Sequence, residues 1–234
     1  MAAMTVLAYI MAIFSEPGSV PSFYIPNIEG DEIPLKEVKK TSGDLRFCQK
    51  CNHYKPPRTH HCHVCNRCVL RMDHHCIWIN NCVGHSNYKI FFLLSVYGAT
   101  TCIYSMVLLG CAIYHVYKNQ QQTGELFKTS HVVCAALLCP LTFGLIFLLI
   151  WHIYLIVNNM TTIENFDGVK SIYGVDRERS NNHHPYDLGA YENFRSVLGR
   201  NVICWLCPTE ANNGSGLYFR TTIRDANTAS SSNV

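Results

Sequence analysis

Two long apolar runs restrict the fold of this 234-residue chain more than any other feature of its sequence. Residues 89–117 carry no charge after Lys89, and residues 131–157 carry none. Each run exceeds the roughly 20 residues that cross the hydrocarbon core of a bilayer. Neither has the polar stripe of a helix on the surface of a soluble protein. We therefore expect two transmembrane helices, and neighbouring helices make Pro140 and Gly144 tolerable in the second.

The N-terminus carries a third, shorter apolar segment. Residues 1–14 are nearly all apolar and end before Ser15-Glu16-Pro17-Gly18. The segment is short for a span, and it lacks the basic region that opens a signal peptide. We interpret it as a partial membrane helix.

The distribution of lysine and arginine predicts the orientation. Ten of these residues fall within 15–89 and seven in the tail after residue 158, whereas the 118–130 connection holds two. Positive charge is enriched on the cytosolic side of membrane proteins. We therefore expect the first segment and the tail in the cytosol, which leaves the sequons at Asn159 and Asn213 without glycans.

Cysteine and histidine are concentrated between the N-terminal segment and the first span. Seven of the thirteen cysteines lie between Cys48 and Cys82, interleaved with six histidines. A secreted disulfide framework is usually small and lacks long apolar runs, whereas CxxC pairs mixed with histidine in a reducing compartment indicate zinc. The segment around them has few large apolar residues, so metal binding is expected to supply its folding free energy.

Structural zinc takes four ligands, and each CxxC turn offers two thiolates. His61 and Cys62 are adjacent, so their side chains tend to diverge toward different metals. The economical solution is two interleaved sites, with the ligand sets Cys48, Cys51, His61, Cys68 and Cys62, Cys65, His75, Cys82. Spacing alone also allows Cys76 in place of Cys82, or His74 in place of His75.

Residues 48–91 resemble the cysteine-rich domain of DHHC-type protein S-acyltransferases, the palmitoyltransferases. The matching motifs run in the order CxxC, KPPR (55–58), HC, CxxC, Cys68, DHHC (73–76), Trp78, Asn80-Asn81-Cys82, Gly84, Asn87 and Phe91. Three flanking features match as well: Glu16-Pro17-Gly18, Thr161-Thr162-Ile163-Glu164, and NFRSVLG (193–199) followed by Trp205. The resemblance extends to about Pro208.

This resemblance implies a reaction and a set of catalytic residues. The family transfers a long-chain acyl group, typically palmitoyl, from acyl-CoA to its own cysteine and then to cysteines of membrane-associated proteins. It implies two structural zinc ions on the ligand sets above, with Asp73, His74 and Cys76 free of metal. An ordinary cysteine is mostly protonated at pH 7, so we expect His74 to take the proton of Cys76 and Asp73 to orient His74.

The resemblance also implies contacts with the donor and supports for the site. We expect cationic side chains to meet the phosphates of acyl-CoA, and Trp78 to border the mouth of the acyl pocket. The candidate cations are Lys55, Arg58 and His60. Three residues are expected to support the site, namely Thr162, Glu164 and Asn193. The [ST]xxE pattern also fits a simple helix cap.

Two other classes of function fit the sequence less well. A membrane-tethered zinc module that binds partners without catalysis would need every zinc ligand, but it would not need Asp73, His74 and Cys76 together. Binding of nucleic acid is disfavoured, because the net charge is only +3 and membrane segments bracket a cysteine-rich segment without a basic helix. The expected partners are acyl-CoA, cysteine-bearing proteins and membrane lipid.

The sequence thus predicts an all-α polytopic membrane protein with a cytosolic, zinc-stapled domain of little regular secondary structure, in the endoplasmic reticulum, Golgi or plasma membrane. The family usually has at least four spans, so a first span and its loop are expected to be absent. The expected segments are 1–14 partial helix, 15–88 cysteine-rich domain, 89–117 span, 118–130 luminal loop, 131–157 span, 158–210 cytosolic tail and 211–234 disordered tail.

Overall fold

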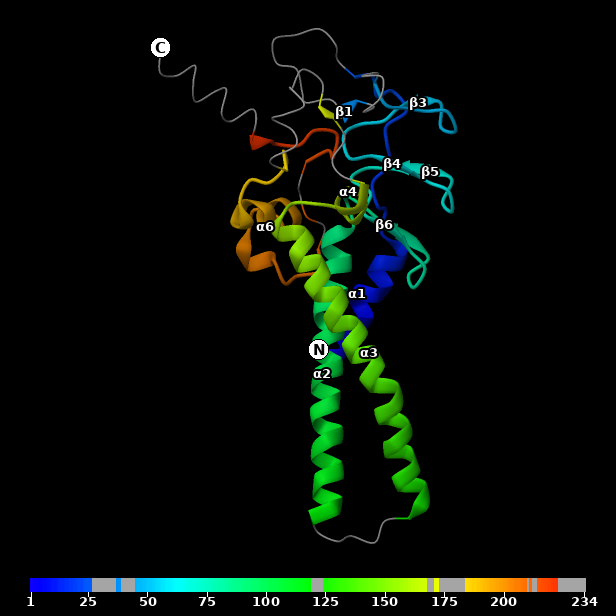
Figure 1. Cartoon of the computed structure of the whole chain (residues 1–234), viewed down its shortest axis with the longest axis vertical. Coiled ribbons are helices and arrows are strands. Elements are labelled where there is room, and N and C mark those ends of the chain that lie inside the picture. Colours follow the sequence, from blue (N-terminus) through cyan, green and yellow to red (C-terminus); the bar gives the residue numbers. More distant parts are fainter. Residues whose placement is uncertain are drawn as a thin grey trace.

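The computed structural model describes residues 1–26, 37–38, 45–118, 124–167, 171–172, 184–209, 211 and 214–222. Three helices form an elongated stalk, α1 (Ala2–Phe14), α2 (Tyr88–Lys118) and α3 (Glu125–Val157). The cysteine-rich segment and helix α6 (Ala190–Leu198) form a head at one end of the stalk (Figure 1). The predicted disordered tail, residues 211–234, lies mostly outside the described residues.

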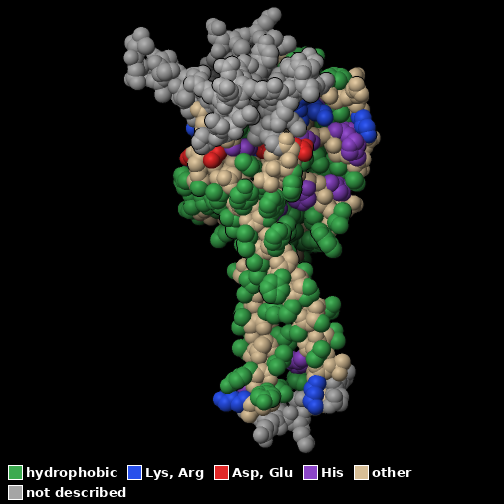
Figure 2. Space-filling model, in the orientation of Figure 1, with side chains coloured by type: hydrophobic (Ala, Val, Ile, Leu, Met, Phe, Trp, Pro, Cys, Tyr) green, Lys and Arg blue, Asp and Glu red, His purple; other side chains and the backbone are tan. Residues whose placement is uncertain are grey.

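Helices α2 and α3 are long and apolar enough to cross a membrane. Each candidate span has 31 residues, which corresponds to about 46 Å of helix against a hydrocarbon core of about 30 Å. Hydrophobic side chains cover the surface of the stalk below the head (Figure 2). Helix α3 begins at Glu125, six residues before the predicted start, because the helix continues past the end of the apolar run.

Helix α1 packs along the head end of α2. Ala8 and Leu93 are fully buried between the two helices, and the hydroxyl groups of Thr5 and Thr101 lie 3.0 Å apart. With 13 residues, α1 is about 20 Å long. It therefore reaches only part of the way along the stalk.

Asn81 joins the end of α1 to the head. Its side-chain Nδ2 donates to the carbonyl oxygens of Ala12 (3.2 Å), Ile13 (3.2 Å) and Ser15 (2.8 Å). The last carbonyl groups of a helix have no partner within the helix. One asparagine thus satisfies the end of α1 and fixes where the head meets the stalk.

The cysteine-rich segment consists of three short antiparallel hairpins, so the prediction of an all-α protein is incomplete. Each strand has only two or three residues. The pairs are β2 (Phe47–Cys48) with β3 (His53–Tyr54), β4 (His60–Cys62) with β5 (Arg67–Val69), and β6 (His74–Cys76) with β7 (Asn81–Val83). A fourth pair joins β1 (Glu37–Val38) and β8 (Ser171–Ile172).

The three hairpins repeat at intervals of fourteen residues. Each turns through an asparagine with positive φ, at Asn52 (54°), Asn66 (51°) and Asn80 (46°). Asparagine is one of the few residues that visit this left-handed region readily. The same interval separates the cysteines that end β2, β4 and β6, which are Cys48, Cys62 and Cys76.

Gly84 holds the chain after α1 against the second hairpin. A Cβ atom at this position would lie 2.6 Å from the carbonyl oxygen of Pro17 and 2.6 Å from Cγ1 of Val69. No other residue type fits such close backbone packing. The amide of Leu70 also donates to the carbonyl oxygen of Gly18 at 3.0 Å, so the Glu16-Pro17-Gly18 turn is part of the head.

Candidate active site and metal centres

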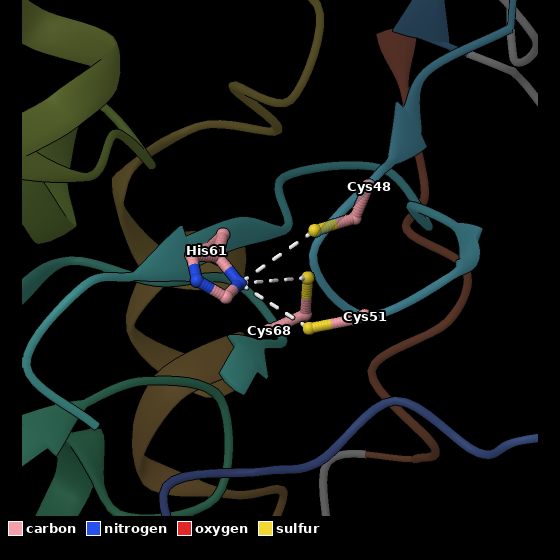
Figure 3. A group of neighbouring side chains, drawn as sticks. All are labelled: Cys48, Cys51, His61 and Cys68. Carbon is pink, nitrogen blue, oxygen red and sulfur yellow. Dashed lines mark hydrogen bonds between the residues drawn. The ribbon is translucent and has the colours of Figure 1, made fainter. Parts of the chain in front are cut away.

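The hairpin register brings the candidate metal ligands together. His61 lies opposite Cys68 in one hairpin, and His75 lies opposite Cys82 in the next. Residues directly opposite each other in antiparallel strands share a face. A CxxC turn from the preceding hairpin completes each set, so each cluster ties two successive hairpins together (Figure 3 shows the first).

The distances within both clusters fit a tetrahedral zinc ion. Nδ1 of His61 lies 3.6, 3.2 and 4.0 Å from the sulfur atoms of Cys48, Cys51 and Cys68. The corresponding distances from Nδ1 of His75 are 3.7, 3.4 and 3.6 Å. A tetrahedron with Zn–S of about 2.3 Å and Zn–N of about 2.0–2.1 Å has an S···N edge of about 3.6 Å.

The sulfur chemistry of the clusters also suits a metal. All thirteen cysteines are free thiols. Burial, together with the neighbouring thiols, raises the pKa of Cys68 and of Cys82 above the usual range for cysteine. A bound cation reverses this effect, because a thiol that coordinates a metal is deprotonated. The clusters therefore have the donor set and geometry of structural zinc sites, and Cys76 belongs to neither.

Strand β6 places His74 and Cys76 on one face and His75 on the other, because side chains alternate along a strand. Nδ1 of His74 lies 2.7 Å from Oδ2 of Asp73, and the side chain of His74 hydrogen-bonds the thiol of Cys76. The three residues form a continuous relay from carboxylate to imidazole to sulfur. We call this set the Asp73–His74–Cys76 relay.

The relay favours a charged imidazolium and a thiolate. Burial disfavours the imidazolium, but the hydrogen bonds to Asp73 and Cys76 outweigh it and raise the pKa of His74 to about 9. Burial likewise disfavours the thiolate. The hydrogen bond from His74 and the backbone N–H groups of Ile79 and Trp78 outweigh that cost and lower the pKa of Cys76.

Helix α4 (Thr162–Asp167) holds Asp73 in place. The backbone N–H of Thr162 donates to Oδ1 of Asp73 at 2.9 Å, and its hydroxyl group donates to Oδ2 at 2.8 Å. Asp73 is completely buried. Burial disfavours the carboxylate, but its hydrogen bonds and the neighbouring histidines lower the pKa of Asp73 overall.

Two residues of the stalk, His152 and Phe91, extend the site. Sequence reasoning missed His152 and named Phe91 only as part of the family motif. The ring of His152 in α3 lies 5.9 Å from that of His74, and its Nδ1 lies 2.9 Å from the hydroxyl oxygen of Tyr88. The ring of Phe91 packs edge-on against that of His74, with the two ring centroids 5.1 Å apart. A lone histidine in an apolar run carries no signal of its own, because only the tertiary structure brings it to the relay.

Arg58 and Glu164 form a buried ion pair next to the support of the relay, since Glu164 and Thr162 belong to the same helix. The guanidinium donates to both carboxylate oxygens at 2.8 and 2.7 Å and to the side chain and carbonyl of Asn159. Burial disfavours the carboxylate, but Arg58 lowers the pKa of Glu164 to about 2. Arg58 is 1% exposed, which supports a structural role rather than the phosphate contact expected from the sequence.

Glu164 also completes a helix cap. The N–H of Thr161 donates to Oε2 of Glu164 at 2.9 Å, and the N–H of Glu164 donates to the hydroxyl oxygen of Thr161 at 3.1 Å. This reciprocal pair is a capping box at the start of α4. The TTxE motif therefore combines both interpretations offered by the sequence, since Thr161 and Glu164 cap the helix and Thr162 binds Asp73.

Asn193 docks α6 onto the end of α3. Its Nδ2 donates to the carbonyl oxygen of Val157 and to Oδ1 of Asp187, both at 2.7 Å, and its Oδ1 accepts from the N–H of Leu188 at 3.0 Å. The side chain is completely buried. Loss of this amide would remove the partner of two part-buried backbone groups, the carbonyl of Val157 and the N–H of Leu188, which costs free energy.

The remaining candidate residues lie at the surface of the head. Lys55 and His60 line a cavity of about 620 Å³ beside the first metal cluster, together with Lys50 and His63. Trp78 lies at the tip of the third hairpin, where 80% of it is exposed and its carbonyl oxygen accepts a hydrogen bond from Tyr9 of α1 at 2.9 Å.

Comparison with known proteins defines the class of this site. A profile described as DHHC palmitoyltransferase matches residues 41–168. "Probable protein S-acyltransferase 16" of Arabidopsis thaliana is 52% identical over 222 residues, which cover 94% of this chain and 78% of that protein. "Probable protein S-acyltransferase 15" of the same plant is 44% identical over 215 residues, with 91% of this chain and 82% of that protein covered.

A more distant relative is human "Palmitoyltransferase ZDHHC20", which is 34% identical over 243 residues, covering 93% of this chain and 63% of that protein. The head and its relay thus define an acyltransferase that acts on cysteine thiols. The chain belongs to the DHHC palmitoyltransferase family.

Proposed function

We propose that Cys76 is the nucleophile of this protein S-acyltransferase and that His74 and Asp73 activate it. The observation that carries this proposal is the separation of the relay from the two clusters of four ligands. Cys76 is the one cysteine of the hairpins that belongs to neither cluster of four ligands, and its thiol lies beside His74. Its thiolate is therefore free to attack a carbonyl carbon.

In the proposed first step, His74 holds the proton of Cys76 and the thiolate attacks the thioester carbonyl of acyl-CoA. A bond forms between the carbonyl carbon and Sγ of Cys76, and the bond to the sulfur of CoA breaks. The departing CoA thiolate takes the proton from His74. Asp73 stabilises the imidazolium during the attack, and Thr162 fixes Asp73 in position.

In the second step, the thiol of a protein substrate loses its proton to His74 and attacks the acyl group on Cys76. The thioester to Cys76 breaks, the acyl chain moves to the substrate cysteine, and Cys76 leaves as a thiolate. The imidazolium and thiolate are then ready for another donor. Such transfer through a covalent intermediate gives ping-pong kinetics.

The two clusters are proposed to hold one structural zinc ion each. Four protein ligands fill a tetrahedral zinc, so neither ion has an open position for a substrate. Zinc supplies folding free energy to hairpins that are too short to be stable alone. His75 lies between His74 and Cys76, so its coordination fixes the strand that carries the relay.

We propose that Lys55 and His60 meet the phosphates of the CoA donor and that Trp78 borders the path of the acyl chain. Besides the candidate metal ligands Cys48 and His61, the cavity beside the first cluster offers four cationic or titratable side chains for the phosphates, Lys50, Lys55, His60 and His63. The exposed indole lies where the head meets the stalk, a level at which tryptophan is enriched in membrane proteins. The protein is proposed to lie in an endomembrane or in the plasma membrane, with the head on the cytosolic side.

Incubation with labelled palmitoyl-CoA and a parallel zinc assay test this proposal. Cys76→Ser should keep two zinc ions per chain and acquire no hydroxylamine-labile label. Cys82→Ser removes one ligand from a four-coordinate site, so it should lose zinc, become sensitive to protease and lose label as well. If Cys76→Ser loses zinc while Cys82→Ser keeps it, Cys76 is a ligand and the proposed nucleophile is wrong.

A further inference from the structure

A second cavity, of about 320 Å³, lies between the hairpins and α6. None of the three relay residues lines it. Its wall contains five arginines and one glutamate. They are Arg58, Arg71, Arg195, Arg200, Arg220 and Glu192.

The carboxylates around this cavity do not balance its arginines. Glu192 accepts from Arg195 at 2.6 Å and from Arg220 at 3.4 Å, so one carboxylate serves two guanidinium groups. Glu164 does not line the cavity, and its carboxylate forms an ion pair with Arg58. Arg71 and Arg200 form no ion pair with a carboxylate in the described part of the chain. An excess of positive charge in a concave, partly buried site attracts an anion.

Arg71 has an unused donor in the cavity wall. Its side chain is 4% exposed, and one terminal nitrogen donates to Oδ1 of Asn159 at 3.0 Å. Its Nε is buried and has no hydrogen-bond partner among the described residues. Burial, followed by repulsion from Arg58, lowers the pKa of Arg71 to about 10. A buried guanidinium in this state gains from a second acceptor.

One further lining side chain has an unused buried donor. Nε of Arg195 lacks a hydrogen-bond partner in the described ranges. The unsatisfied donors thus come from the chain between the second and third hairpins, at Arg71, and from α6, at Arg195, and both residues line one space.

We infer that this cavity binds a phosphate group as a site separate from the acyl-transfer centre. The planar guanidinium fork of arginine matches the oxygens of phosphate and forms paired, charge-assisted hydrogen bonds. A phosphate carries more negative charge than a carboxylate and offers more acceptors. The group has two possible sources, the headgroup of an anionic phospholipid and a soluble phosphate compound.

The test compares binding by the full chain, its Arg195→Gln/Arg200→Gln double variant and an Arg67→Gln control. Arg195 and Arg200 lie on the cavity wall and outside the relay. Arg67 forms a similar surface pair with Glu16, at 2.8 Å, outside the cavity. Surface pairs of this kind add little to stability, and two zinc ions per chain in every variant verify the fold.

One arm adds inorganic phosphate at constant ionic strength to the detergent-solubilised protein. The other places the protein in phosphatidylcholine nanodiscs with and without phosphatidic acid. Neither contains CoA. The thermal midpoint should rise with phosphate, and Kd should increase by about tenfold or more in the double variant but not in Arg67→Gln.

A response to both probes assigns the site to a free phosphate group, and a response to phosphatidic acid alone assigns it to a lipid headgroup. Either result supports the site if the probe no longer raises the thermal midpoint of the double variant. The inference is overturned if neither probe raises the thermal midpoint, or if wild type and double variant respond equally.

Discussion

At the scale of single residues, the site depends on side chains that are fixed by partners far away in the sequence. Asp73 receives both its N–H and its O–H donor from Thr162, 89 positions later. Arg58 and Glu164 are separated by 106 positions. Such contacts position the relay only once the tail has folded back onto the hairpins, so acylation should depend on residues remote from Cys76.

Thr162 provides a direct test. Thr162→Val removes the hydroxyl that donates to Asp73 at 2.8 Å, whereas Thr162→Ser keeps it. A hydrogen bond to a charged group contributes about 1.5–3 kcal/mol, so single-turnover acylation of the valine variant should be about 10- to 100-fold slower. Zinc content should be unchanged. If valine and serine variants both react at the wild-type rate, the hydroxyl does not position Asp73.

Lys55 and His60 should affect donor binding without affecting the chemistry. The Lys55→Ala/His60→Ala variant should show a higher KM for palmitoyl-CoA and a similar kcat, since a phosphate contact is made equally in the ground and transition states. Lys118→Ala, at the far end of α2, is the matched control. An unchanged KM, or a loss confined to kcat, would place the phosphates elsewhere.

The sequence identifies those site residues that lie at regular short intervals along the chain. The CxxC pairs, the histidines beside them and the DHHC run form a local pattern, and the structure gathers both predicted ligand sets. Spacing alone left Cys76 and Cys82 interchangeable, and the resemblance to a family was needed to separate them. His152, Arg71 and Asn159 have no such pattern, because their neighbours come from other elements.

At the scale of elements, α4 links the relay to the core of the head. Its first turn binds Asp73 through Thr162 and Arg58 through Glu164. Six residues are too few for a helix to be stable alone, so these contacts and the capping box sustain it. A change at Glu164 therefore weakens both the head and the support of the relay.

Glu164→Gln should show how much the buried Arg58–Glu164 ion pair contributes to the stability of the head. Removing one partner of a buried ion pair costs about 3–5 kcal/mol. Because Arg58 lowers the pKa of Glu164 to about 2, the stabilisation is fully present above about pH 4.5 and is lost as pH falls toward 2. The gap between wild-type and variant thermal midpoints should narrow over that range, and a gap independent of pH would contradict the assignment.

Long elements were predictable and short ones were not. Apolar runs of 27 to 29 residues indicate helices by length alone, and α2 and α3 cover both. The strands of the hairpins are two or three residues long, which is too short for a period of two to emerge. In the second and third hairpins, cross-strand pairs of candidate metal ligands, rather than hydrophobic alternation, account for the strands.

At the scale of the whole molecule, the third hairpin points its apolar tip toward the level at which head and stalk meet. Ile77 and Trp78 are 75% and 80% exposed, and the tip is tied to α1 through Tyr9. The last residue of α2, Lys118, and the first of α3, Glu125, lie at the opposite end of the stalk (Figure 1). We therefore expect head and connection to lie on opposite sides of the membrane.

Protease protection tests this arrangement. An epitope inserted after Gln121 should survive protease in sealed microsomes and be digested only after detergent is added. An epitope at the C-terminus should be digested in both cases, if the head is cytosolic. The reverse pattern would show that the predicted orientation is wrong. Glycosylation of Asn159 is a poorer probe, since its side chain is buried among hydrogen-bond partners.

The interval of fourteen residues between the hairpins has a consequence for the ancestry of the enzyme. Cys48 and Cys62 each receive a backbone N–H from the second thiol residue of their CxxC turn, and Cys76 receives the equivalent N–H from Ile79. We propose that tandem copying of one metal-binding unit produced this spacing. The third unit has Ile79 in place of a second thiol, so its first sulfur, that of Cys76, is left available for the proposed acyl transfer.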